Sequence, residues 1–418
     1  MDGTDAIARH AALDVRMARA AKGIRLLSYA SWPASERDRF LADYSRGKAR
    51  LPNYAYPKHD FGEVRREFEA IAAEADPDHP IGQYLIESAR DWDLAAQLLE
   101  NLGTPRVAEL SQALFGGPER ALPGGATTRE AANHFITVAD EMDRELLAPA
   151  EQVEISATAL VLQLQARLDD FFDGRVITVE LDPDLIAKAA AGATRIRVRS
   201  GAAFSDYDMQ QLLQHEAFVH SLTALNGQQQ TVLPSLALSS PRTTATQEGL
   251  AVFAEQITGS IDIERMKRVS LRIEAVAMAQ DGADFMAVFR YFIDAGQDPV
   301  ESFTSAQRVY RGVPTTGGHA FTKDTVYLRG LIGIHTFFRW ALKNGRLRLC
   351  RLLFAGKMTL ADVRRFEPLF GEGGLIEPRW LPEWVARANG LAGALAFSLF
   401  ANRIRLDQVV AADSVTDI

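Results

Sequence analysis

Residues 205–220 read SDYDMQQLLQHEAFVH, and the predicted fold is centred on this stretch. Ser205 is followed three positions later by Asp208, a spacing that forms a capping box at the start of a helix. The apolar and polar residues that follow keep a helical pattern. We therefore predict one helix that begins directly after Ser205 and carries both His215 and His220.

This helix contains an HExxxH pattern, His215 to His220, with Glu216 directly after the first histidine. It is one residue longer than HExxH, in which two histidines one turn apart bind zinc and the adjacent glutamate activates water. Residues five apart differ by about 140° around an α-helix, against about 40° for residues four apart. A single wider π-type turn would restore a common face, and we predict that distortion here. Without it, His215 would be exposed, His220 a core residue and Glu216 part of a solvated face.

The third ligand is sought downstream by elimination. Between His220 and Gln247 the chain contains no His, Cys, Asp or Glu. Glu248 is the first candidate, near the start of a second helix expected to open at Thr244 or Thr246. A downstream glutamate is the third ligand of gluzincin peptidases, and no histidine follows at metzincin spacing.

Two histidines and one glutamate predict one Zn²⁺ per chain with an open position for water, whose pKa the metal lowers toward about 7. Glu216 is the expected base that takes the proton of this water. Glu255, seven residues after Glu248, either orients a ligand histidine or is a surface carboxylate. The same ligand types also suit iron in oxygenases, but a glutamate directly after the first histidine favours hydrolysis.

Four segments together resemble a known family: IRVRSGAAFSDYD from Ile196, HEAFVH from His215, TQEGLA from Thr246 and FTKDTVYLRG from Phe321. In this order they are similar to the QEGLA-motif proteins, also labelled flavohaemoglobin expression-modulating, and to related microtubule tyrosine carboxypeptidases. The resemblance spans roughly residues 177–330. It implies a zinc metallopeptidase that acts on C-terminal residues, with the metal on His215, His220 and Glu248 and the base on Glu216.

The predicted fold class is α+β and predominantly helical, a gluzincin-like zinc metallopeptidase core with a small β-sheet and two ligand-bearing helices. Residues 177–182 and 195–199 alternate apolar and polar side chains with period two, as half-buried strands do. Residues 195–199 are the candidate edge strand that pairs with an extended substrate. Their arginines could instead keep an exposed edge soluble.

Three regions are expected along the chain. Residues 1–125 form an N-terminal helical region that ends at glycine and proline clusters, and residues 126–300 form the metallopeptidase core. Residues 301–418 form a C-terminal helical region that completes the cleft. Within it, a long apolar helix is expected to start at Lys323, with Thr322 as its N-cap.

A peptidase that acts at C-termini needs a cation for the terminal carboxylate. The candidates are three basic residues in loops or at helix starts near the motifs: Arg311, Lys323 and Arg242. Each could equally be a solvated surface charge. His319 is the candidate donor to the developing oxyanion, with Tyr310 and Tyr327 as competitors.

Composition limits the partners and the location. The net charge of -8, with 46 basic and 54 acidic residues spread along the chain, gives no reason to expect nucleic acid or a membrane as partner. The single Cys350 excludes an internal disulfide and a cysteine metal site. No secretory signal pattern and no apolar run of roughly 20 residues is found, so a cytoplasmic location is expected. The oligomeric state has no signal in the sequence.

The function these observations favour is a zinc-dependent metallopeptidase, a carboxypeptidase that removes C-terminal residues from peptides or proteins. Two alternatives remain: a non-catalytic zinc-binding regulatory protein, and a hydrolase of small amides, which the same residues would serve. Glu216 favours catalysis, because a binding module needs no base beside its metal. Patterns for nucleotide binding and for a serine nucleophile, GxGxxG, GxxxxGK[ST] and GxSxG, are absent.

Overall fold

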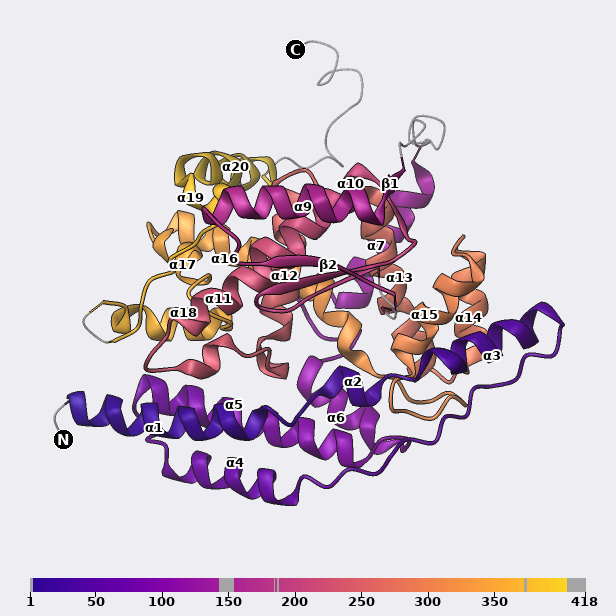
Figure 1. Ribbon diagram of the computed structural model, residues 1–418, viewed down its shortest axis with the longest axis horizontal. Coiled ribbons are helices and arrows are strands. Elements are labelled where there is room, and N and C mark those ends of the chain that lie inside the picture. Colours follow the sequence, from indigo (N-terminus) through magenta and orange to yellow (C-terminus); the bar gives the residue numbers. More distant parts are fainter. Residues whose placement is uncertain (1–2, 143–153, 184, 186–187, 372–373, 404–418) are drawn as a thin grey trace, which may run out of the picture.

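A computed structural model describes residues 3–142, 154–183, 185, 188–371 and 374–403. Helices form most of the body, and the strands are short and few (Figure 1). The helices of the N-terminal third lie along one side, and those of the C-terminal part gather at another. This confirms the predominantly helical class with a small sheet.

The N-terminal part is helical up to Phe115, as expected for its region. Its helices are α1 (Gly3–Ala21), α2 (Leu26–Ala30), α3 (Ala34–Ser45), α4 (Gly62–Glu74), α5 (Pro80–Glu100) and α6 (Arg106–Phe115). Helix α5 begins with a proline at its first position, where the missing N–H costs no hydrogen bond. Helices α1, α4 and α5 pack side by side through buried side chains such as Met17, Ile71 and Leu85.

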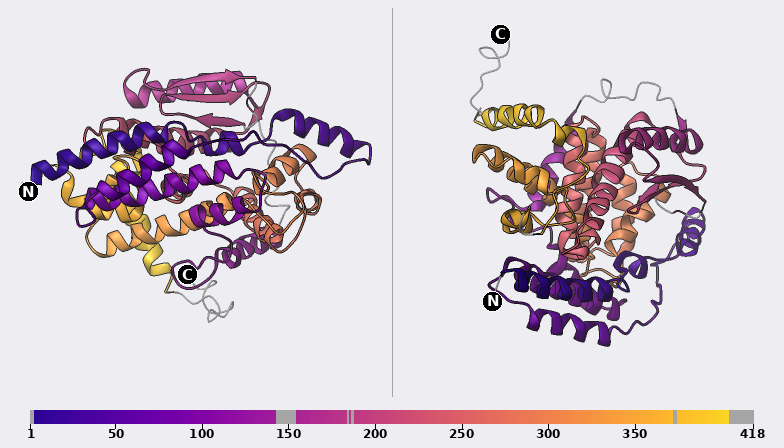
Figure 2. Two further views of the ribbon diagram at one scale, coloured as in Figure 1. Left: turned by 90° about the horizontal axis from the view of Figure 1, so that it is seen from below. Right: turned by 60° about the vertical axis from the view of Figure 1, so that its left-hand side comes forward.

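Two small sheets follow α7 (Thr128–Glu141) and accompany α9 (Ala157–Phe172). One pairs β1 (Ile155–Ser156) with β5 (Ala203–Phe204); the other consists of β2 (Thr178–Asp182), β3 (Ala189–Ala191) and β4 (Arg195–Arg199). The left view of Figure 2 shows the three-stranded sheet on the outside of the helical body.

The strand order β2-β4-β3 corrects one expectation. Strand β4 pairs in parallel with β2 and antiparallel with β3, so it is the central strand. Its backbone groups are already used on both sides, and β4 cannot accept an extended substrate as an added strand. Sequence alternation showed that residues 195–199 form a strand, but it could not show how many neighbours that strand has.

The histidine-bearing segment is one continuous rod made of α10 (Asp206–Gln211), the π-helix η1 (Leu212–Ser221) and α11 (Leu222–Gln228). Ser205 caps it through the predicted capping box with Asp208. The predicted π distortion is confirmed, and it extends over ten residues rather than one turn. The wider turn brings residues five apart onto one face of the helix.

Two further segments complete the centre of the molecule. After the short 3-10 turns η2 (Pro234–Ala237) and η3 (Pro241–Thr243), α12 (Thr244–Ile257) crosses α16 (Val326–Lys343). Residues Thr322–Thr325 form a 3-10 turn, η4, so the α-helix expected from Lys323 begins three residues later. Tighter 3-10 winding is common in the first turn of a helix.

Helices α12 and α16 touch through glycine. A Cβ on Gly249 would lie 2.1 Å from the carbonyl carbon of Gly330, and a Cβ on Gly330 would lie 2.1 Å from the carbonyl oxygen of Ala245. Only residues without a side chain allow the two backbones to approach this closely. Gly249 belongs to TQEGLA and Gly330 to FTKDTVYLRG, so these two motifs meet at this crossing.

The remaining helices surround this centre: α13 (Ile263–Gln280), α14 (Phe285–Asp294), α15 (Pro299–Val309), α17 (Arg348–Leu352), α18 (Leu360–Phe366), the 3-10 turn η5 (Glu367–Leu369), α19 (Glu383–Ala386) and α20 (Ala388–Ala401). Both buried apolar clusters draw side chains from each of the three expected regions, whose division stays a prediction. Among the described residues, no helix combines the length and the apolar character that a membrane span requires.

Candidate metal centre

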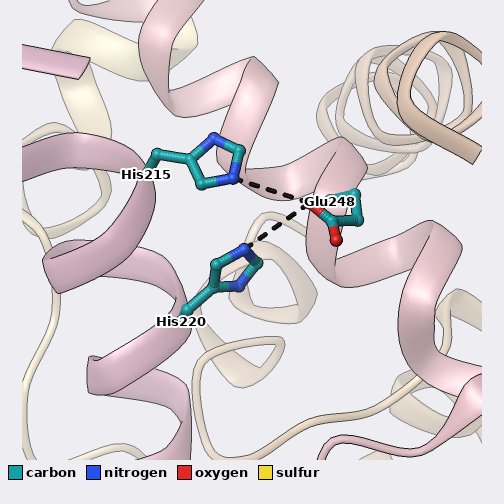
Figure 3. Close-up of side chains that lie close together, drawn as sticks. All are labelled: His215, His220 and Glu248. Carbon is teal, nitrogen blue, oxygen red and sulfur yellow. Dashed lines mark ion pairs between the residues drawn. The ribbon is translucent and has the colours of Figure 1, made fainter. Parts of the chain in front are cut away.

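The π-helix η1 and helix α12 bring the three predicted metal ligands together (Figure 3). Oε2 of Glu248 lies 3.5 Å from Nε2 of His215 and 3.6 Å from Nε2 of His220. Two ligand atoms on a tetrahedral zinc ion, each 2.0–2.1 Å from the metal, would be about 3.4 Å apart. The donor types and these two distances fit a zinc ion, and all three ligand atoms lie within 4.8 Å of one another, so the group could hold a metal.

A second carboxylate contacts His215 at Nδ1, the ring nitrogen that does not face Glu248. Its Nδ1 lies 2.6 Å from Oε1 of Glu255, which is fully buried and not a surface carboxylate. Arg265 donates to both oxygens of Glu255 at 3.1 and 3.2 Å. A carboxylate on the far nitrogen fixes the ring and turns Nε2 toward Glu248. Burial alone would lower the pKa of His215, but hydrogen bonds to Glu248 and Glu255 raise it to about 10.

Glu248 is held by a buried cation. Nζ of Lys323 donates to Oε1 of Glu248 at 2.9 Å, which leaves Oε2 facing the two histidines. Burial would raise the pKa of Glu248, but the Lys323 ammonium keeps it well below its usual range. Lys323 was a candidate for the substrate carboxylate; the structure pairs it with a candidate metal ligand instead. Only 6% of Lys323 is exposed, so the pair is shielded from water.

Three successive residues of α12 have separate contacts. Oε1 of Gln247 accepts a hydrogen bond from Oγ1 of Thr223 at 2.9 Å, which ties α12 to the histidine-bearing rod. Glu248 faces the histidines, and Gly249 meets the backbone of α16. Because α16 follows directly on the turn that carries Lys323, the glycine contact also brings this lysine to Glu248.

Glu216 is partly exposed and stands apart from these ion pairs. In the part of the chain that the structure describes, its carboxylate has neither a hydrogen bond nor an ion pair, although it interacts electrostatically with His215. An unpaired carboxylate beside the candidate ligands is free to accept a proton.

Lys357 is a charged residue near Glu248 and Glu216 that the sequence analysis did not identify. Its Nζ donates to Oγ of Ser239 at 2.7 Å, and only 7% of the residue is exposed. Burial lowers the pKa of Lys357 to about 8, while Glu248 and Glu216 act in the opposite direction. A single lysine in the loop before α18 has no periodic or spacing signal that could have indicated this position.

The other candidate substrate residues lie in different surroundings. Arg242 forms ion pairs with Asp362 and Glu87, and two carboxylates already compensate its charge. Arg311 is partly buried and makes no hydrogen bond or ion pair with any described residue. His319 is partly exposed, and no contact between it and the metal group is found in the described ranges.

Tyr327, the remaining candidate, lies beside Lys323. Its hydroxyl is 3.4 Å from Nζ of Lys323 and 3.4 Å from a guanidinium nitrogen of Arg308. Lysine and arginine can only donate, so the hydroxyl oxygen accepts from both and its own hydrogen stays available. Tyr310, the competing tyrosine, donates instead to the backbone carbonyl of Ala283 at 2.6 Å.

This arrangement defines a class: helical proteins in which an HExxxH helix and a downstream glutamate form a group able to hold a metal next to a free carboxylate. The family model of the microtubule-associated tyrosine carboxypeptidase matches residues 38–403, and the chain belongs to this family. The resemblance to microtubule carboxypeptidases is thereby confirmed over most of the chain, and it supports a carboxypeptidase-type peptidase. The narrower QEGLA-motif assignment stays a prediction.

Two further comparisons add little. No curated protein matches the chain. Metallocarboxypeptidase 1 of Trypanosoma cruzi is similar at 13% sequence identity, over 95% of this chain and 99% of that chain, with a TM-score of 0.39. This similarity is too distant to inform the site.

Proposed function

We propose that this protein is a zinc-dependent carboxypeptidase that removes C-terminal residues from peptides or proteins, with one Zn²⁺ per chain held by His215, His220 and Glu248. The observation that carries the proposal is the convergence of these three side chains beside the unpaired carboxylate of Glu216. Family membership supports the direction of attack, from the C-terminus. A cytoplasmic location and a substrate that is neither nucleic acid nor membrane stay predictions.

In this proposal, each residue near the metal centre has a separate role in peptide hydrolysis. A bound zinc ion would lower the pKa of a water molecule and polarise a peptide carbonyl. Glu216 takes the proton of the attacking water and later gives it to the departing amine. Tyr327 donates its free hydrogen to the carbonyl oxygen as negative charge develops there. Glu255 and Lys323 hold His215 and Glu248 in position.

Tyr327 is a better candidate for the oxyanion than His319. Its hydroxyl is within hydrogen-bond reach of Lys323, which itself contacts Glu248. For His319, no such link to the metal group is found among the described residues. The role of His319 therefore stays a prediction from sequence without structural support.

The test compares wild type with Glu216→Gln. We expect both proteins to bind about one zinc per chain, measured by plasma mass spectrometry, because Glu216 is not a ligand. Only wild type should release C-terminal amino acids from a mixed peptide library, and the variant should lose about 10²- to 10⁴-fold in rate. Zinc in both proteins without cleavage by either would favour the regulatory protein or the small-amide hydrolase. Absence of zinc from both would overturn the metal site.

A further inference from the structure

Helix α20 is apolar on all sides, but the protein body covers only one of its faces. Its 14 residues, ANGLAGALAFSLFA, include no charged side chain. Leu391, Leu395 and Ser398 follow one another at helical spacing and therefore share a face. Both leucines are buried, and Oγ of Ser398 lies 3.3 Å from Nε2 of His335 on α16. This face attaches α20 to the rest of the structure.

The opposite face of α20 is exposed. Four residues at helical spacing form it, and each of them is exposed: Gly390, Gly393, Phe397 and Phe400. The exposed fractions of the two phenylalanines are 74% and 63%. Figures 1 and 2 show α20 at the periphery of the molecule. A helix that is apolar all round is normally buried all round, so this face indicates a binding surface. We call these four residues the open face of α20.

The charges around the open face are mainly positive. From residue 379 to residue 403 the charged side chains are three arginines and one glutamate, all exposed: Arg379, Glu383, Arg387 and Arg403. Arg387 directly precedes α20, and Arg403 lies two residues beyond its end. Glu383 pairs with Arg387, which leaves a net positive charge here although the whole chain carries -8. The total charge gave no reason to expect a membrane, but the local charge complements an anionic surface.

We propose that the open face of α20 docks this protein onto an anionic lipid surface. Phe397 and Phe400 enter the boundary between headgroups and acyl chains, about 5–10 Å deep, and Arg387 and Arg403 lie close to the headgroups. An interfacial helix needs a polar side opposite its apolar side, and here the protein body occupies that side. With 14 residues, α20 is shorter than the roughly 20 that a membrane span requires, so it lies on the surface. This docking is independent of the proposed peptidase function.

A second copy of the chain fits the open face less well. At about 1.5 Å per residue and a diameter of about 10 Å, α20 offers about 200 Å² of contact area. A stable protein–protein interface buries about 800 Å² on each partner. Two antiparallel copies of α20 would also bring Arg387 of one chain to Arg403 of the other, and like charges repel. Binding to a lipid surface instead rises gradually with each apolar side chain inserted and each anionic headgroup contacted.

The experiment measures binding of the full chain to lipid vesicles by co-sedimentation. Two compositions are used, phosphatidylcholine alone and phosphatidylcholine with about 30% phosphatidylserine. One variant combines Phe397→Ser with Phe400→Ser, and a second combines Arg387→Gln with Arg403→Gln. Leu162→Ser is the matched control, because Leu162 is also an apolar side chain with a large exposed fraction, 68%, but lies on α9.

We expect wild type to bind the anionic vesicles at least about tenfold more tightly than phosphatidylcholine alone, and this preference should shrink in high salt. The phenylalanine variant should lose about 10- to 100-fold in affinity for both compositions, because two aromatic side chains no longer leave water. The arginine variant should lose only the preference for phosphatidylserine. Leu162→Ser should bind as wild type does. The urea midpoint of the phenylalanine variant should equal that of wild type, since only exposed side chains change.

Four other results would overturn the docking proposal. Wild type that binds neither vesicle composition would exclude a lipid partner. Equal binding by wild type and the phenylalanine variant would place the lipid contact elsewhere on the protein. A wild-type dimer and a monomeric phenylalanine variant in sedimentation velocity would show that a second copy covers the open face. A lower urea midpoint of the phenylalanine variant would show that another segment of the chain covers it. None of these measurements depends on zinc or on cleavage, so the peptidase proposal stands or fails separately.

Discussion

Gly249→Ala is expected to damage both the fold and the metal centre through one added methyl group. The new Cβ would lie 2.1 Å from the carbonyl carbon of Gly330 and 2.4 Å from its oxygen. Ordinary carbon contacts lie at about 3.5–4.0 Å, so α12 and α16 would have to separate locally by about 1.5 Å. Overpacking of this kind costs about 1–3 kcal/mol of the free energy of unfolding.

The same shift acts on the metal group, because Glu248 precedes Gly249 directly. Metal sites tolerate errors of about 0.2 Å in ligand distance, far less than the expected displacement. We therefore expect zinc affinity to fall by about 10- to 100-fold, the loss that follows when a supporting contact of a ligand is removed. Urea unfolding and competition with a zinc chelator measure the two effects in one preparation.

Gly333→Ala provides the control on α16. A Cβ at Gly333 would have Leu360 Cδ1 as its nearest atom, at 4.0 Å, so alanine fits without a clash. Alanine in a helix interior is favoured over glycine by about 0.5–1 kcal/mol, and this variant should be more stable than wild type with unchanged zinc affinity. If Gly249→Ala matched Gly333→Ala in both measurements, the close helix crossing would not be what positions Glu248.

Three further changes test separate contacts. Glu255→Gln removes the charge behind His215 and should lower zinc affinity by about 10- to 100-fold in chelator competition; unchanged affinity would contradict the orienting role. Lys323→Met removes the ammonium from Glu248, which keeps His215 and His220 as neighbours, and should destabilise zinc-free protein by about 1.5–3 kcal/mol in urea unfolding, the range for a lost hydrogen bond to a charged group, whereas a loss under about 1 kcal/mol would show that the pair is unimportant. Burial raises the pKa of Asp14 to about 7 from 3.8, so the folded state binds the extra proton and the free energy of unfolding contributed by this group falls as pH rises from 4 to 7. The loss should reach about 4 kcal/mol, and Asp14→Asn should abolish it in urea titrations across that range; an identical pH profile for both proteins would refute the assignment.

Local features of this protein could be predicted from neighbours in sequence. The capping box of Ser205 and Asp208, the strand at residues 195–199 and the start of α12 follow from hydrogen bonds and side-chain periodicity within a few residues. The π-helix was predictable because two histidines five apart cannot share a face of an α-helix. Glu248 was identified because no other ligand-type residue lies between His220 and the second helix.

What the sequence by itself determined is therefore the set of candidate ligands, the candidate base and the helices that carry them. Only the tertiary structure decided which charges are paired: Lys323 with Glu248, Arg242 with Asp362, and Arg272 with no described residue. It also decided that β4 is a central strand. The physical reason is that an ion pair or a strand neighbour depends on the packing of segments far apart along the chain, whereas a cap or a helical face depends on residues within one or two turns.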